Sequence, residues 1–321
     1  MSKEHDLVLV IDALNLFTRH YVAHPAVSEN GSQVGGVVGF LYAIVNLVEQ
    51  YRAVKVIVVW ESGGSPRRRA IHKDYKSKRR PEKLNRYYED DLPDTVENRN
   101  YQISLIVELL KNTPVRQIYV QDCEADDVIA YLSRYTFKEN RKMIVSSDRD
   151  YYQLLDEKTI IYSPTWKKFV TSKDVIKKFG ISPENFCLAK CICGDISDNI
   201  EGVKGVGFKT LSKRFPELLI SDNVHISDVV KASREKLSEG NKLKIYKGIS
   251  ESEDLIRRNW KLIYLDMGML AASQIKKIDD SIDTFEPERN KIQMIRILMR
   301  EGIQTFNVDR LFLSLNCVEA K

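Results

Sequence analysis

LVLVID (residues 7–12) sets the architecture of this chain, because five apolar residues, three of them β-branched, run directly into the carboxylate of Asp12. Three further short runs have the same β-branched character: KVIVVWE (55–61), IYVQD (118–122) and MIVSSD (143–148). Such runs are typical of strands buried on both faces. The stretches between them, which include 35–51, 101–111 and 125–135, are long enough for helices. Strands that alternate with helices predict a parallel α/β sheet with both faces covered.

The pattern changes in the second half of the chain. TIIYSPTWKKFV (159–170) predicts a hairpin, and SKDVIKKFG (172–180) predicts a helix. Beyond residue 181 the strand signal fades and helices dominate. We therefore expect an α/β core over residues 1–180 and a mainly helical region over residues 181–321.

A long insertion interrupts the expected core at about residues 63–95, where the apolar periodicity disappears. Its basic part, residues 67–86, holds ten Lys and Arg against two acids, a local net charge of +8. The whole chain carries only +5, so the other residues sum to −3. A concentrated basic segment in a near-neutral protein favours a polyanionic partner such as nucleic acid. The alternative is a solvated charged helix or loop.

Composition excludes several classes of protein. Among 321 residues, 43% are hydrophobic and 30% charged, which fits a globular chain with a sizeable core. There is no apolar run of the roughly 20 residues that a membrane span needs, and MSKEHDLVLVID (1–12) lacks a signal-peptide core. We expect a cytoplasmic protein. Five cysteines are too few for a disulfide framework, and Cys187, Cys191 and Cys193 are interpreted as buried thiols rather than metal ligands.

Acidic side chains stand at the ends of all four predicted strands. The set is Asp12, Glu61, Glu124, Asp126, Asp127, Asp148 and Asp150. The carboxyl ends of parallel strands share one edge of a sheet, and ligand sites form along that edge. Each acid alone could be a helix cap or a solvated first-turn residue. Four coincidences at four strand ends favour a common cleft instead.

A cleft of this kind needs cations, because crowded carboxylates repel one another. Oxygen-only ligand sets suit hard divalent ions, which predicts Mg²⁺, with Mn²⁺ able to substitute. Two such ions about 4 Å apart can activate a water and stabilise the leaving oxygen of a phosphodiester.

GDISDNIEGVKGVGFKT (194–210) is the second informative segment. Gly205 and Gly207 lie between two short helical stretches, within a predicted helix–hairpin–helix at about residues 194–214. Glycines let the backbone approach a phosphate, and Lys209 adds a positive charge. The spacing fits neither a P-loop nor a dinucleotide fingerprint; a glycine-rich turn between core helices is the alternative. Asp195 and Asp198, spaced i, i+3, could complete the metal cleft.

The ordered motifs IDALN, VVWE, CEADD, SSDRD, GDISDN and GVKGVGFKT resemble those of the 5′ nuclease family, which comprises flap endonucleases and 5′–3′ exonucleases. Within that family the chain is most similar to the T-even phage type of ribonuclease H. The resemblance covers about residues 6–215 and implies a parallel-sheet, PIN-like nuclease core with a helical C-terminal region. Glu61 departs from the family pattern, in which the second strand usually ends in Asp.

The resemblance also implies roles for individual residues. The expected first-metal ligands are Asp12, Glu61, Glu124, Asp126 and Asp148. The expected second-metal ligands are Asp150, Asp195 and Asp198, with Asp127 nearby. The expected DNA contacts are Arg19, Arg68, Tyr75, Lys76, Arg79, Gly205, Gly207 and Lys209. Lys76 and Arg79 would also orient the scissile phosphate and, with Asp148, take part in catalysis.

These features predict a metal-dependent 5′ nuclease that cuts phosphodiesters at 5′ ends, flaps or RNA primers of DNA duplexes. The expected partners are DNA and RNA–DNA hybrid with a 5′ single strand, together with a single-strand-binding protein. We expect a monomer without a membrane partner, in the bacterial host cytoplasm if the chain is phage-encoded. Two alternatives stay open: a single-strand ribonuclease on a related fold, and a non-catalytic protein that binds DNA structures.

Overall fold

The computed structural model describes residues 6–61, 63–77 and 96–318. One sheet of six strands carries the predicted core. The strands are β1 (Leu7–Asp12), β2 (Lys55–Trp60), β3 (Arg116–Tyr119), β4 (Arg141–Val145), β5 (Thr159–Ser163) and β6 (Lys168–Val170). Their order across the sheet is β3-β2-β1-β4-β5-β6. The first five run parallel, and β6 pairs antiparallel with β5, so the predicted hairpin forms one margin of the sheet.

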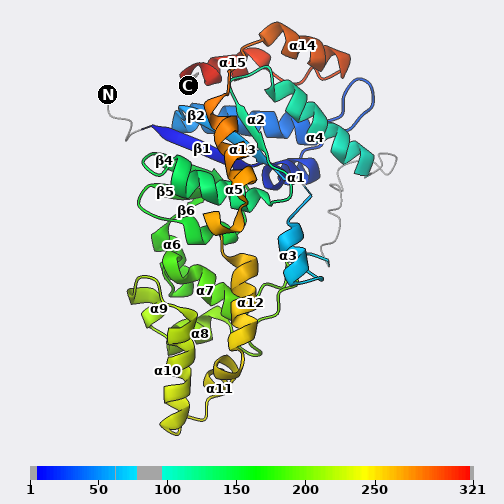
Figure 1. The fold of residues 1–321 in the computed structure, drawn as a ribbon. Helices are drawn as coiled ribbons and strands as arrows, with labels where there is room; N and C mark the ends of the chain where they lie inside the picture. Colours follow the sequence, from blue (N-terminus) through cyan, green and yellow to red (C-terminus); the bar gives the residue numbers. More distant parts are fainter. Residues whose placement is uncertain (1–5, 62, 78–95, 319–321) are drawn as a thin grey trace.

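Most of the remaining regular structure in the described residues is helical (Figure 1). Those before the hairpin are α1 (Ala13–Ala23), α2 (Gly35–Tyr51), α3 (Pro66–Ile71), α4 (Val96–Leu110) and α5 (Ala125–Tyr131). Those of the next region are α6 (Ser172–Phe179), α7 (Pro183–Cys193), α8 (Phe208–Arg214), α9 (Glu217–Ile220), α10 (Ile226–Ser238), α11 (Lys244–Glu251) and α12 (Glu253–Ile263). The last three are α13 (Ala272–Asp283), α14 (Lys291–Arg300) and α15 (Val308–Ser314).

Alternate residues of each central strand pack into two separate hydrophobic cores, one on each face of the sheet. Leu9 and Ile11 of β1 pack with α1, α2, α4, α14 and α15, whereas Val8 and Val10 pack with α5 and α13 on the other face. This double burial is why the strands are apolar along their whole length. The prediction of a parallel α/β sheet covered on both faces is confirmed.

The helices expected after residue 181 pack into more than one hydrophobic core. A third core joins α7 to α12, residues 181–263, in the lower lobe of Figure 1. From Leu265 onward the chain returns to the sheet, where Ile278 joins one core and Met294, Leu298 and Leu311 join the other. Hydrophobic helices after residue 264 are indistinguishable by pattern from those before it, so sequence alone could not separate them.

Three local expectations have clear outcomes. The helix predicted at 35–51 is α2, and the helix predicted at 172–180 is α6, which opens with a capping box between Thr171 and Asp174. Cys187 and Cys191 are buried in α7 and Cys193 is partly buried, which agrees with structural thiols. The basic insertion contains α3 and a turn at residues 73–77, while residues 78–95, including Arg79, lie outside the described residues.

Candidate active site

The carboxyl edge of the sheet opens into a cavity of about 640 Å³. Its acidic walls come from the ends of β1 and β2, the start of α5 and the segment after β4. The acids that line it are Asp12, Glu61, Glu124, Asp126 and Asp148. Arg19, Tyr75 and Lys76 line the same cavity. The topology therefore brings together the acids expected at the first metal and three of the expected DNA contacts.

Asp12 and Asp126 are held by a tyrosine that the sequence reasoning did not single out. The hydroxyl of Tyr151 donates to Asp126 Oδ1 at 2.5 Å and lies 3.3 Å from Asp12 Oδ2. Ser146 Oγ also donates to Asp12 Oδ2, at 3.0 Å, and the Asn15 amide caps the other oxygen at 3.1 Å. Tyr151 is fully buried. Its position directly after Asp150 was the only sequence signal for this role.

Burial and crowding make three of the cavity acids harder to ionise. Burial, followed by repulsion from Asp126, raises the pKa of Asp12 to about 7. The same two causes raise the pKa of Glu61 to about 7 and that of Asp148 to about 6. The ligand-type oxygens of Asp126, Asp148 and Asp150 lie within 4.8 Å of one another. Close, partly buried carboxylates that repel one another form a ligand set that fits a divalent cation.

A second acidic group adjoins the first through Asp150. Oxygens of Asp150, Asp195 and Asp198 lie within 4.8 Å of one another, so the three expected second-metal ligands are brought together. Lys190 of α7 contacts Asp150 and lies 2.6 Å from Asp195. Burial alone would raise the pKa of Asp195, but Lys190 and hydrogen bonds from Ser197 hold it below its usual range.

Lys190 is a further residue that sequence reasoning missed. It projects from α7, whose other residues are largely apolar, and is only 7% exposed. A lysine inside CLAKCIC (187–193) is the signal that could have revealed it, because a buried ammonium needs an acidic partner. Its charge compensates the second group in part, on the side where the α7 backbone approaches η3 (Asp150–Leu154).

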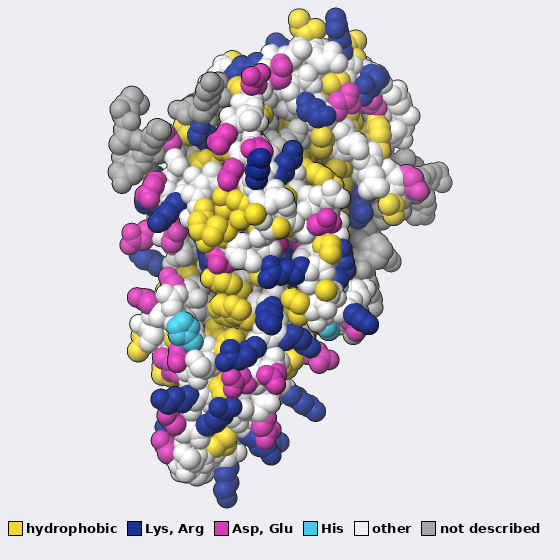
Figure 2. Space-filling model, in the orientation of Figure 1, with side chains coloured by type: hydrophobic (Ala, Val, Ile, Leu, Met, Phe, Trp, Pro, Cys, Tyr) yellow, Lys and Arg dark blue, Asp and Glu magenta, His cyan; other side chains and the backbone are white. Residues whose placement is uncertain are grey.

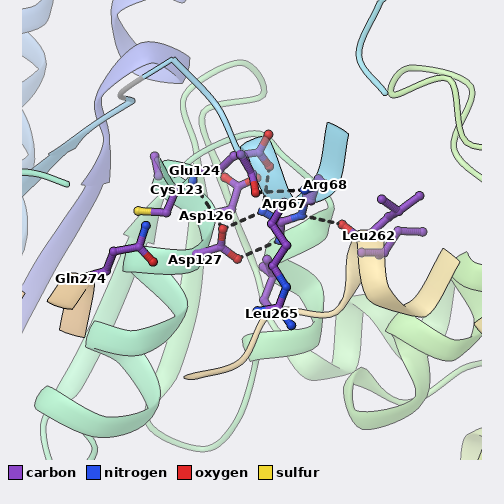
Figure 3. Close-up of polar contacts among 12 residues, drawn as sticks. Arg67, Arg68, Cys123, Glu124, Asp126, Asp127, Leu262, Leu265 and Gln274 are labelled. Atoms are coloured by element: carbon purple, nitrogen blue, oxygen red, sulfur yellow. Dashed lines mark hydrogen bonds and ion pairs between the residues drawn. The ribbon is translucent and has the colours of Figure 1, made fainter. Parts of the chain in front are cut away.

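Arg68 and Asp127 occupy places different from those expected. Arg68 donates from both terminal nitrogens to Asp127, at 2.6 and 2.7 Å, and from one of them to Glu124 at 3.1 Å (Figure 3). Its Nε donates to the carbonyl of Leu262 at 2.9 Å. Arg68 and Asp127 are each 1% exposed. Arg68 therefore lies in a buried ion pair rather than at the surface, and Asp127 faces Arg68 rather than the cavity. A charged residue in a basic run can be drawn inward by a buried acid.

Both carboxylate oxygens of Glu124 have partners within the protein. It accepts from the Tyr75 hydroxyl at 2.9 Å, while Lys76 Nζ lies 2.8 Å away. These contacts seat the turn after α3 on the first turn of α5. The backbone N–H of Lys76 donates to the carbonyl of Asp198 at 3.0 Å, which ties the same turn to the second acidic group. Lys76 is thus placed between the two groups of acids.

The glycine segment lies apart from the cavity. It joins α7 to α8, with Gly205 at a φ of +78° and Gly207 at the N-cap of α8. Gly205, Gly207 and Lys209 are exposed, and a Cβ at either glycine would meet no atom within 4 Å. Gly205 has a backbone conformation that favours glycine, and no close internal contact requires glycine at either position, so the backbone of this turn is open to solvent.

A parallel sheet with two adjoining acidic groups at its carboxyl edge defines a class: α/β enzymes that hold divalent cations with carboxylates. Residues 7–180 match the family model described as the 5′-3′ exonuclease, N-terminal resolvase-like domain. The chain belongs to the 5′–3′ exonuclease family, which confirms the resemblance drawn from its motifs.

Relatives with assigned names agree with this membership. The chain is 32% identical to a 5′-3′ exonuclease of Aquifex aeolicus over 203 residues, which cover 63% of this chain and 66% of that protein. It is 32% identical to the thermostable DNA polymerase I of Thermus thermophilus over 237 residues, covering 73% of this chain and 27% of the polymerase. The matched part is thus about two thirds of the exonuclease and about a quarter of the polymerase.

Solved structures support the fold. The bacteriophage T5 5′-exonuclease with bound zinc has a TM-score of 0.66 at 23% identity, covering 92% of this chain and 99% of that one. The bacteriophage T5 flap endonuclease in a pseudo-enzyme–product complex with DNA and metal ions has a TM-score of 0.63 at 21% identity, covering 96% and 97%. The expected nuclease fold, with a mostly parallel sheet and a helical C-terminal region, is confirmed.

Proposed function

We propose that this protein is a divalent-metal-dependent 5′ nuclease that hydrolyses phosphodiester bonds at 5′ ends, flaps or RNA primers of DNA duplexes. One observation carries the proposal: two groups of carboxylates adjoin at Asp150, and Lys76 lies beside both. Binding of an uncharged substrate would gain nothing from two cation sites beside a lysine. A phosphodiester needs both, because its negative charge must be neutralised before a nucleophile can approach.

The residues divide the work by position. Asp12, Glu61, Asp126 and Asp148 are proposed to hold one ion, and Asp150, Asp195 and Asp198 the other. The bound ions would supply activation of water and stabilisation of the leaving oxygen. Tyr151 and Ser146 fix the orientation of the ligand oxygens. Glu124, already held by Arg68, Tyr75 and Lys76, is proposed to position Lys76 rather than to bind an ion directly.

Lys76 is proposed to contact the scissile phosphate. Its side chain is 19% exposed, and its ammonium group is held by Glu124 at the wall of the cavity. Arg19 of α1 lines the same cavity and is proposed to hold a neighbouring phosphate. Gly205, Gly207 and Lys209 are proposed to contact the duplex backbone, which would position the substrate without reading its bases.

The finer identity of substrate and cofactor is also a proposal. Mg²⁺ is the proposed ion at both sites, with Mn²⁺ as a substitute, because hard oxygen ligands favour these cations. The resemblance to the T-even phage ribonuclease H supports removal of RNA primers, an RNA–DNA hybrid substrate and a single-strand-binding partner. It also supports a monomer acting in the cytoplasm, that of the bacterial host if the chain is phage-encoded. No helix among the described residues is long and apolar enough to cross a membrane.

Replacing Asp148 tests the proposed function. Asp148→Asn keeps the shape of the side chain but removes the charge of a cavity acid, so cleavage of a 5′-flap DNA with Mg²⁺ should fall at least 1000-fold. Binding of the same DNA should change by less than about threefold, because phosphate contacts dominate affinity. Asp266→Asn, which removes a partly exposed acid outside the cavity, is the matched control. Wild-type cleavage by Asp148→Asn would overturn the proposal.

Substrate comparison separates the remaining alternatives. A 5′ nuclease should cut flap DNA and a primer hybrid, a single-strand ribonuclease should cut plain RNA, and a non-catalytic protein should bind the flap and cut nothing. Each assay is run with Mg²⁺ and with EDTA, so that cleavage without the ion identifies a contaminant.

A further inference from the structure

The turn between β5 and β6 presents an aromatic side chain flanked by lysines. Trp166 is 43% exposed, and the ammonium groups of Lys168 and Lys178 lie 5.7 Å from the centre of its ring system. Lys168 comes from the hairpin and Lys178 from α6, so two separate elements converge on this one indole. An exposed tryptophan between two cations has no packing function that explains its exposure.

The surroundings are strongly basic. Residues 167–178 contain five lysines and one acid, and all five lysines are exposed. The acid, Asp174, is used within the protein, since it accepts from the amide and hydroxyl of Thr171 at 2.9 and 2.7 Å. Asp174 keeps its charge and offsets Lys168 and Lys177 in part, so the segment retains a net charge of +4. Such a surface complements a polyanion.

Two hollows meet at this surface and lead towards the glycine segment. One of about 310 Å³ is lined by Trp166, Lys168 and Lys178, with Asp174 and Phe179 also in its wall. The next, of about 450 Å³, shares Lys178 and Phe179 and reaches Gly207–Thr210. On the other side, Thr165, the residue before Trp166, lines the acidic cavity. The hairpin turn thus lies between the candidate metal sites and the glycine segment.

The turn is also fixed to the acidic cavity. Ser147, next to Asp148, donates to Thr165 Oγ1 at 2.9 Å and accepts from the Thr165 amide at 3.2 Å. Below the turn, Phe179 packs on Tyr152 of η3 and on Phe208 of α8, with ring centres 6.2 and 5.1 Å apart. These contacts hold Trp166 at a set distance from the acids.

We propose that Trp166 is a stacking site for a base of the bound nucleic acid, with Lys168 and Lys178 contacting the phosphates on either side of it. The inference rests on the proposed function, since it assumes a nucleic-acid substrate in the acidic cavity. Flat aromatic side chains in a basic groove hold bases without sequence preference, and long lysine side chains can move from the ring to a phosphate. Trp166 would then fix which phosphodiester reaches the acids.

Affinity and salt dependence distinguish stacking from simple charge attraction. Trp166→Ala should weaken binding of a 5′-flap DNA, measured in EDTA to prevent cleavage, on the order of tenfold, the effect of losing one base stack. The slope of log affinity against log salt should stay unchanged. Trp166→Phe, which keeps a ring, should bind within about threefold of wild type. Lys178→Gln should reduce the salt slope by about one, whereas Lys291→Gln, on α14, should leave it unchanged.

Fluorescence reports the contact directly. Trp60 is buried and Trp260 is partly buried and stacked on Tyr264, so Trp166 is the most exposed of the three tryptophans. DNA should quench the wild-type emission, and Trp166→Phe should lose that quenching. Thermal melts of each variant exclude unfolding as the cause of weaker binding.

Two results would overturn the stacking site: wild-type affinity in a folded Trp166→Ala protein, or DNA-dependent quenching that survives in Trp166→Phe. Cleavage of the flap by wild-type protein with Mg²⁺ is scored separately. A protein that cuts DNA but shows either result retains the proposed function and loses this inference. A protein that binds DNA through Trp166 but never cuts it retains the stacking site and loses the proposed function.

Discussion

Tyr151 shows how a single hydroxyl can organise a site made of like charges. Its donor lies within reach of both Asp126 and Asp12, which come from different elements. Groups that orient metal ligands commonly change metal affinity 10- to 100-fold when removed. Tyr151→Phe keeps the ring in its buried place and removes only that donor.

We expect Tyr151→Phe to raise the Mg²⁺ concentration needed for half-maximal cleavage about tenfold or more, with a smaller effect on the rate at saturating Mg²⁺. A Mg²⁺ titration of flap cleavage measures both quantities. Tyr152→Phe, one residue along the same η3 helix, is the matched control, because its hydroxyl donates to neither carboxylate. An unchanged Mg²⁺ requirement in Tyr151→Phe would show that the hydroxyl does not orient the ligands.

At the scale of elements, Arg68 joins α3, α5 and α12. One guanidinium reaches Asp127, Glu124 and the carbonyl of Leu262, and all of these contacts are buried (Figure 3). A lysine could carry the charge but could not make the paired contacts of the planar group. Breaking a buried ion pair costs about 3–5 kcal/mol, and a lysine should recover part of that.

Arg68→Lys should therefore lower the Tm by several degrees while leaving the salt slope of DNA binding unchanged. Calorimetry gives the first quantity and a salt titration the second. Arg69→Lys, a neighbouring residue in α3 that is exposed, should change the Tm little. A reduced salt slope with an unchanged Tm would restore Arg68 to the DNA contacts expected from sequence.

Sequence predicted these elements better than it predicted the direction of their side chains. The strand-end acids were found because the period of the strands and the position of each acid are both visible in sequence. The burial of Arg68 and Lys190 was not foreseen, because their positions depend on acids about 60 and 40 residues away. Lys190 stands in an apolar stretch that hints at burial, but nothing in the basic run around Arg68 distinguishes an arginine that faces DNA from one that faces a buried carboxylate.

At the scale of the whole molecule, the sheet-based core and the helical lower lobe (residues 181–263) lie on either side of the acidic edge (Figure 1). Lys and Arg side chains are spread over the lower lobe on the face shown in Figure 2. The acids at the edge oppose that attraction until cations occupy them. The net charge of +5 is thus a poor guide to DNA affinity, because the charge at the cavity changes with metal and with pH.

That coupling predicts an unusual dependence of stability on pH. The pKa values of Asp12 and Glu61 are raised to about 7 by burial and by Asp126, so the folded protein holds protons that the unfolded chain has released. Where the folded state binds more protons, the free energy of unfolding falls as the pH rises, here between about pH 4 and 7. His20 has the opposite effect. Burial lowers the pKa of His20 to about 4, so the stability that the neutral imidazole contributes is lost as the pH falls from about 6.5 towards 4.

Comparing wild type with Asp12→Asn separates the effect of this acid on stability from that of His20, which both proteins contain. In EDTA, wild type should lose on the order of 2 kcal/mol of stability relative to Asp12→Asn between pH 5.5 and 8, because the asparagine has no proton to release. Adding Mg²⁺ at pH 8 should raise the wild-type Tm by more than it does at pH 5.5, since protons and cations compete for the same oxygens. Thermal melts at both pH values, with and without Mg²⁺, measure each term. A parallel pH dependence in wild type and Asp12→Asn would mean that this carboxylate is not forced towards protonation, and the repulsion that makes the cleft a cation site would be absent.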